Sequence, residues 1–311
     1  MTRYIIKRLF SMIPILLAVA IIIFTLMFVI PGDPVTTAMS EYATAAEIEA
    51  AKEALGYNRP YMVQLLDYLK DLIINFDFGT SFTYGIPVAP ELVKRAPKTM
   101  LIAALSIIMI CIVGIPIGIR AAVKANTAED RISMFICLLG VSMPTFWLAL
   151  LMILFFSLKL GWLPSNGDAS LKYFIMPAVC AALSGIANIA RQTRSAMLEV
   201  INSDYVVTAR AKGQTEHNVI YKHALPNALI PVITLCGMRF GRALGDTVIL
   251  ETVFNITGLG TFLIDGIKLR DYDVVQGSVI FIAFMFSVIM LIVDLIYAFV
   301  DPRIRARYAG K

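Results

Sequence analysis

Three ionisable side chains lie in an otherwise apolar or small-residue stretch, residues 229–250. At 100° of rotation per residue, Arg239, Arg242 and Asp246 fall on one side of a helix. Another side carries glycine at every fourth position from Gly237, a pattern that lets two membrane helices approach closely. A charge in hydrocarbon costs at least about 2.5–3.5 kcal/mol, so these side chains must face protein or water. They are candidates for lining a solute path, and the alternative that they only pair to hold helices together stays open.

Signatures of nucleotide, metal and nucleophile chemistry are missing from the sequence. There is no G-x-x-x-x-G-K-[ST] run for phosphates, no H-E-x-x-H or Cys/His cluster for a metal, and no serine in a G-x-S-x-G setting. We therefore expect no catalytic residue, no metal site and no cofactor in this chain. All four cysteines lie in apolar segments, which predicts free thiols.

The elements that must position these residues are membrane helices. The chain is 59% hydrophobic and 16% charged, whereas soluble chains carry about 25% charged residues. Crossing a bilayer takes about 20 helical residues, and six apolar blocks qualify: Leu9–Ile30, Thr99–Ile119, Ile132–Leu158, Phe174–Ala190 (the shortest), Leu229–Leu250 and Val279–Val300. The prediction is an all-α integral membrane protein with about six transmembrane helices. Without an internal repeat or linker, residues 1–311 are expected to form one domain.

Charge asymmetry predicts the orientation of these helices. The termini and the segments 120–131 and 191–225 carry 15 basic and 6 acidic residues, whereas the segments on the other side carry 10 and 14. Because Lys and Arg concentrate on the cytoplasmic side, both termini are expected in the cytoplasm. The same placement accounts for the formal charge of +5 without a nucleic-acid partner, and the lipid bilayer is the expected environment.

The segment 31–98 is predicted to be an extracytoplasmic helical insert. Thr44 and Glu47 have the spacing of a capping box at the start of a short helix that ends at Gly56. Pro60 suits the first turn of a second helix. A lid that packs over the membrane helices is favoured over one that contacts solute.

The segment 202–226, called the elbow below, is too polar to span a membrane yet lies between two apolar blocks. Asp204 is expected to cap a short helix that ends before Gly213, where glycine suits a left-handed turn. A second helical stretch is expected from Glu216 to Leu225-Pro226. A short helix held outside the bilayer fits a cleft in a soluble partner, and the alternative is an ordinary amphipathic loop.

The elbow resembles the EAA loop of binding-protein-dependent ABC importer permeases, with Ala209, Gly213 and Leu225-Pro226 at that motif's spacing. Val207, Thr208 and His223 depart from the general motif. The whole run is instead similar to the dipeptide/oligopeptide/nickel branch of the family. Further stretches with the same resemblance extend along nearly the whole chain: Pro31–Pro34, Ala54–Pro60, Phe78–Ser81, Ser142–Thr145, Gly258–Gly260 and Arg270–Asp273.

The resemblance implies a permease subunit of a bacterial plasma (inner) membrane importer, forming half of the path for peptides. Its implied partners are a second related permease, an extracytoplasmic solute-binding protein and two cytoplasmic ATPases that bind ATP and Mg. The implied ATPase-coupling residues are Asp204, Tyr205, Thr208, Ala209, Arg210, Ala211, Lys212, Gly213, Leu225 and Pro226. Two alternatives stay open: the same machinery importing nickel or a metal chelate, and an ion-coupled secondary transporter, which often shows an inverted repeat.

Overall fold

The computed structural model describes residues 2–30, 35–36, 39 and 43–300 of the chain. Within these ranges, one isolated bridge between Thr80 and Pro87 is the only pairing of extended segments, and the predicted all-α class is confirmed. The α-helices are α1 (Thr2–Val29), α3 (Ala45–Leu55), α4 (Tyr61–Lys70), α5 (Val88–Met109), α6 (Ile115–Val123), α7 (Ala128–Ser142), α8 (Thr145–Met152), α9 (Lys172–Ile201), α10 (Asp204–Ala211), α11 (Glu216–Asn218), α12 (Leu225–Val253), α13 (Leu259–Leu269) and α14 (Tyr272–Val300). Four π-helical stretches continue some of them: η1 (Asp71–Asn75), η2 (Ile110–Gly114), η3 (Ile153–Lys159) and η4 (Val219–Ala224).

The helices long and apolar enough to cross a membrane agree with the predicted number. Five continuous runs qualify, and a bent pair of helices makes up to six if the pair forms one span. The runs are Arg8–Val29, Val88–Val123, Lys172–Ile201, Glu216–Val253 and Tyr272–Ile296, and the bent pair is Ala128–Ser142 with Thr145–Lys159.

The third apolar block is not a single straight helix, contrary to the prediction for Ile132–Leu158. α7 and the run that begins with α8 meet at an angle of 98°. Pro144 explains the break, because its ring disfavours helical dihedrals at the residue before it. That residue, Met143, is extended with φ −86° and ψ 126°. The bend falls inside Ser142–Thr145, one of the stretches that resemble the permease family.

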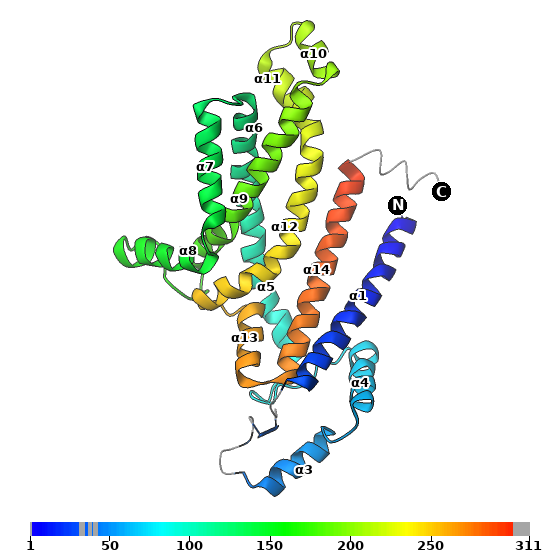
Figure 1. Cartoon of the computed structure of the whole chain (residues 1–311). Helices are drawn as coiled ribbons and strands as arrows, with labels where there is room; N and C mark the ends of the chain where they lie inside the picture. Colours follow the sequence, from blue (N-terminus) through cyan, green and yellow to red (C-terminus); the bar gives the residue numbers. More distant parts are fainter. Residues whose placement is uncertain (1, 31–34, 37–38, 40–42, 301–311) are drawn as a thin grey trace. The chain divides into compact units, whose positions relative to one another are not determined.

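The chain forms two compact units, one mainly from residues 100–256 with 288–300 and the other mainly from residues 6–99 with 257–287. In the first unit, α9 lies alongside α6, α7 and α12 (Figure 1). Small residues allow this close packing: a Cβ on Gly118 of α6 would lie 2.5 Å from the carbonyl oxygen of Ala190 in α9. α9 is therefore the central helix of this unit.

α9 is much longer than the predicted block Phe174–Ala190, with 30 residues from Lys172 to Ile201. The apolar pattern stops before the helix does, because the last turns carry arginines. The Arg194 guanidinium donates two hydrogen bonds of 2.7 Å to the carboxylate of Asp130 in α7. This ion pair gives the polar end of α9 a packing partner.

Two prolines inside helical runs are preceded by π-helical turns. η2 precedes Pro116 and η4 precedes Pro226, and such wider turns help to accommodate the missing proline N–H. The predicted end of a helix at Leu225-Pro226 is therefore wrong, since residues 216–253 form one continuous helical run.

The second unit contains the two helices predicted within segment 31–98. The Thr44 hydroxyl accepts a hydrogen bond from the Glu47 N–H (3.3 Å), and the Glu47 carboxylate accepts one from the Thr44 N–H (2.7 Å). The bond from the Thr44 N–H also lowers the pKa of Glu47. α3 ends before Gly56, which is left-handed at φ 76°, and α4 follows Pro60. The capping box and the start of α3 are confirmed, whereas Pro60 occupies the N-cap position of α4, one residue before the first turn predicted for it.

α13 is a helix that the sequence analysis did not predict between residues 251 and 275. Leu259 and Phe262 on its buried face share a core cluster with Val88 and Leu92 of α5 and Val274 of α14. At 11 residues the helix is too short to span a bilayer, so no apolar block of spanning length marks it in the sequence.

Candidate functional site

α10 forms an exposed helix that a narrow apolar face holds in place. Val206 and Ala209, three residues apart and therefore on one side of the helix, are both buried. They belong to a core cluster of the first unit together with Ile119, Ala122, Ala196, Met197, Val219, Ile220, Ala224 and Ala228. The apolar face of α10 thus packs against α6, α9 and the first part of the helical run 216–253 that contains α12.

The two ends of α10 differ in how well the sequence predicted them. Ser203 occupies the N-cap position with extended dihedrals, so the prediction that Asp204 caps the helix is wrong by one residue. Asp204 is the first helical residue, where a carboxylate still interacts favourably with the helix dipole. Gly213 has φ 78°, the left-handed conformation predicted for it. A Cβ there would meet nothing within 4 Å, so the backbone dihedral and not space requires glycine.

Two polar contacts across the elbow fix its shape. The Arg210 guanidinium donates to the Glu216 carboxylate at 2.8 and 3.2 Å, and this bond raises the pKa of Arg210. The Asn227 amide donates to the Tyr205 hydroxyl at 2.8 Å. Sequence reasoning selected Arg210 and Tyr205 but missed the roles of Glu216 and Asn227. Side-chain contacts within one helix join residues three or four apart, whereas these pairs are 6 and 22 residues apart. Only the opposite charge of Glu216 could have indicated the first pair.

The predicted coupling residues divide between the inner and outer faces of the elbow. Ala209 is buried, Leu225 packs partly buried against the same cluster, and Arg210 is half-buried. The exposed residues are Asp204, Tyr205, Thr208, Ala211, Lys212, Gly213 and Pro226. Val207, which the prediction left out, is 52% exposed among them. A helix that is packed on one face and has a mixed apolar and charged outer surface is suited to docking in a cleft of a soluble protein.

The polar stripe predicted at residues 239–246 lies on α12. Arg242 and Asp246 are exposed and Arg239 is half-buried. Over the described ranges, the structure shows no ion pair or side-chain hydrogen bond for any of the three, so Arg242 and Asp246 do not pair with each other. The stripe is open to water, solute or a second subunit, and its role stays a prediction.

The side of α12 that carries the glycines contacts another helix near one of its ends. A Cβ on Gly237 would lie 2.1 Å from a methyl of Val293 in α14, which means that the two helices touch there. At Gly245 a Cβ would meet nothing within 4 Å. The predicted close approach of two helices is therefore present near Gly237 and absent near Gly245 in the described part of this one chain.

Two of the family-like stretches meet in the second unit. The carboxylate of Asp271, 1% exposed, accepts hydrogen bonds from the Ser81 hydroxyl (2.5 Å) and the Thr83 N–H (3.1 Å). Asp273 accepts one from the Thr80 N–H (3.1 Å). Both carboxylates thus hold the segment between η1 and α5 against the start of α14.

The fold and the elbow define a class, the multi-pass membrane permease. A methionine ABC transporter, MetNI in inward-facing conformations, shares this fold at a TM-score of 0.59 and 22% identity, over 68% of this chain and 97% of the other. The family model described as binding-protein-dependent transport system inner membrane component matches residues 114–306, and the model for its N-terminal part matches residues 1–103. The chain belongs to this family and is a permease subunit of a bacterial inner-membrane ABC importer.

Two relatives are similar over nearly their whole length. The chain is 39% identical to the dipeptide transport system permease protein DppB of Alkalihalophilus pseudofirmus, over 98% of this chain and 100% of that protein. It is also 39% identical to the glutathione transport system permease protein GsiC of Escherichia coli K12, over 98% and 99%. These similarities agree with the predicted branch of the family.

Proposed function

We propose that this chain forms half of the translocation path of an ATP-driven peptide importer and pairs with a second, related permease. The observation that carries the proposal is the exposed, rigidly packed elbow on a chain of the importer-permease family. Peptides are the proposed solutes because the two relatives are named for dipeptide and glutathione transport, and glutathione is itself a small peptide.

Energy is proposed to come from two cytoplasmic ATPase subunits that bind ATP and Mg. This chain supplies the docking surface and no nucleotide site. The outward residues of α10 lie in a groove of one ATPase, while Val206 and Ala209 pass its movement to the core cluster around α9 and α12. ATP then shifts the permease between inward-open and outward-open states, because the ATPase pair differs in shape between its nucleotide states.

Both termini and the elbow are proposed to be cytoplasmic, with α3 and α4 on the outer side. The positive-inside distribution of Lys and Arg supports this orientation. An extracytoplasmic solute-binding protein would deliver peptide to the outer side, and the exposed stripe on α12 is the proposed wall of the path.

The test is purification of this subunit from its native host in mild detergent, followed by reconstitution into liposomes. Two ATPases and a second permease should copurify, and a labelled dipeptide should accumulate only with ATP and the solute-binding protein present. Transport by the chain alone, driven by an ion gradient, would instead establish a secondary transporter.

A matched pair of variants tests the docking surface. Val207→Asp places a charge on the outer face of α10 and should reduce ATPase recovery about tenfold or more, since an unpaired buried charge is costly. Ile267→Asp on α13 is the control, because Ile267 has the same 52% exposure and lies outside the candidate spans. Equal ATPase recovery with both variants would rule out α10 as the docking helix.

A further inference from the structure

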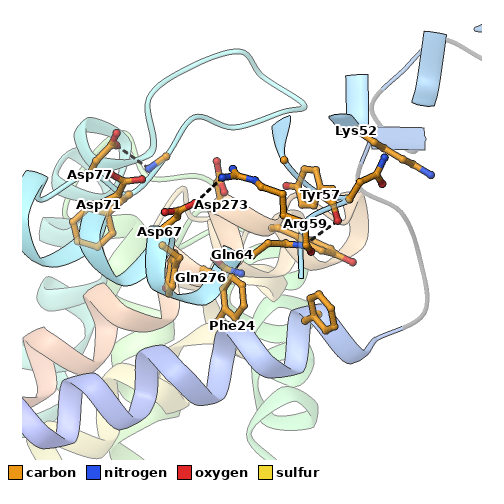
Figure 2. Close-up of a pocket in the computed structure, with 17 residues that line it drawn as sticks. Phe24, Lys52, Tyr57, Arg59, Gln64, Asp67, Asp71, Asp77, Asp273 and Gln276 are labelled. Atoms are coloured by element: carbon orange, nitrogen blue, oxygen red, sulfur yellow. Dashed lines mark hydrogen bonds and ion pairs between the residues drawn. The ribbon is translucent and has the colours of Figure 1, made fainter. Parts of the chain in front are cut away.

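The second unit contains a cavity of about 480 Å³ (Figure 2). This volume is within the range of about 300–1,000 Å³ that is usual for small-molecule sites. Its walls come from the end of α1, from the stretch between Lys52 and Gly79 that contains the end of α3, α4 and η1, and from the start of α14. None of these residues belongs to the elbow or to the stripe on α12.

The charges that line this cavity do not balance. Its acidic residues are Asp67, Asp71, Asp77 and Asp273, and its basic residues are Lys52 and Arg59. Arg59 is ion-paired with Asp67 at 2.7 Å. The other three carboxylates accept hydrogen bonds from neutral donors, namely the Asn75 amide, the Gly79 N–H and the Thr80 N–H. None of these three is ion-paired with a Lys or Arg of the described residues, so the cavity presents excess negative charge.

Aromatic rings form the rest of the cavity wall, and one of them carries a buried hydroxyl without a hydrogen-bond partner among the described residues. The rings are Phe24, Phe28, Tyr57, Tyr68, Phe78 and Tyr272, and the faces of such rings attract cations. Tyr68 stacks on Phe24 with ring centroids 5.1 Å apart. The Tyr68 hydroxyl oxygen exposes less than 1 Å² and has no hydrogen-bond partner among the described residues. Burial, and next the charge of Asp273, raise the pKa of Tyr68, so this hydroxyl stays protonated and adds no negative charge to the cavity.

We propose that this cavity binds a compact organic cation, an alkylammonium or guanidinium group. Carboxylates without a cationic partner supply the charge, and the rings supply apolar and cation–π contact. The group could belong to a free basic peptide or to a Lys or Arg side chain of a docked solute-binding protein. That the cavity opens to the outer side rests on the orientation proposed above, whereas cation binding does not.

The test uses the intact permease complex in lipid nanodiscs, where both faces are open to solvent. The probes are N-acetyl-arginine amide and N-acetyl-citrulline amide, which differ in one cationic group, titrated by isothermal calorimetry at low salt. The arginine probe should bind saturably, at least about tenfold more tightly than the citrulline probe. Its affinity should fall as salt is added, because partly exposed charges are screened.

The variants Asp71→Asn and Asp77→Asn remove one charge each and keep an oxygen for the existing hydrogen bond. Each should weaken binding of the arginine probe by about tenfold. Tyr68→Phe keeps the ring that lines the cavity and removes only a buried hydroxyl, so it should change binding by less than about twofold. Asp265→Asn is the matched control, because Asp265 lies on α13 in the same unit and does not line the cavity.

Lack of saturable binding, equal binding of both probes, or full affinity in the Asp71→Asn/Asp77→Asn double variant would overturn the proposal. Competition between the arginine probe and the solute-binding protein would assign the cation to a protein side chain. Binding of the probe without such competition would assign it to a free solute. ATP-driven dipeptide uptake is measured separately, so a complex that transports normally but fails to bind the probe refutes only the cation site.

Discussion

At the scale of single residues, the elbow combines positions with opposite requirements. Ala209 is buried at 7% exposure against residues of α9 and η4, so it must be small. Gly213 has open space beside it but a left-handed backbone, so its constraint is conformational. One position limits volume and the other limits dihedral angle, and together they orient α10 on the core cluster.

The Gly213 constraint gives a residue-scale prediction. Gly213→Val should cost about 1–2 kcal/mol in the left-handed conformation, displace α10, and lower peptide uptake per ATP hydrolysed by several-fold. Gly213→Asn is the matched control, because asparagine tolerates this conformation. Uptake and ATP hydrolysis are measured together in reconstituted liposomes, and normal coupling in a fully assembled Gly213→Val complex would refute the role of this turn.

At the scale of elements, α9 links the elbow to the membrane helices. It ends three residues before α10 begins, and it packs against α6, α7 and α12. The Asp130–Arg194 pair is the polar contact between α9 and α7, with side-chain exposures of 5% for Asp130 and 27% for Arg194. We therefore expect a movement of α10 to reach α7 through α9, because the Asp130–Arg194 ion pair joins α9 to α7.

Removal of one partner of this pair should destabilise the first unit. Arg194→Met leaves Asp130 buried without its cation and should cost about 3 kcal/mol. The double variant Asp130→Asn/Arg194→Met should recover part of that loss, because the uncompensated charge is gone. Arg191→Met, at an exposed arginine of the same helix, is the control. Thermal unfolding in detergent measures the parent protein and the three variants, and a double variant no more stable than Arg194→Met would contradict a coupled pair.

At the scale of the whole molecule, one chain leaves a charged face of α12 uncovered. Arg242 and Asp246 are exposed, and Gly245 beside them has open space. Exposed charges on a helix long enough to span a bilayer require water or another protein surface. A second permease that faces this side across a water-filled path would meet that requirement.

Cysteine accessibility in the assembled complex distinguishes a solute path from a packed interface. In a background without native cysteines, Arg242→Cys and Asp246→Cys should react with a water-soluble maleimide at least about tenfold faster than Ala243→Cys, which replaces a buried residue. Labelling is followed by mass spectrometry with and without ATP. Equally slow labelling at all three positions would show that the stripe only packs against the partner subunit.

The sequence by itself determined the features that depend on a few neighbouring residues. These include the apolar blocks, the capping box at Thr44, the left-handed turn at Gly213 and the shared side of Arg239, Arg242 and Asp246. Each follows from a local periodicity or from one residue's dihedral preference, so no distant partner is needed to specify it. The order of the family-like stretches likewise sufficed to predict the class of permease.

Only the tertiary structure decided which distant groups meet. Arg194, beyond the apolar block of α9, pairs with Asp130 of α7, and Asp271 accepts a hydrogen bond from Ser81 although 190 residues separate them. The acidic cavity exists because three separate stretches of the chain, in α1, between residues 52 and 79, and in α14, pack around it. Such contacts arise from how helices pack, and a periodic pattern specifies which side of a helix is buried but not which residue covers it.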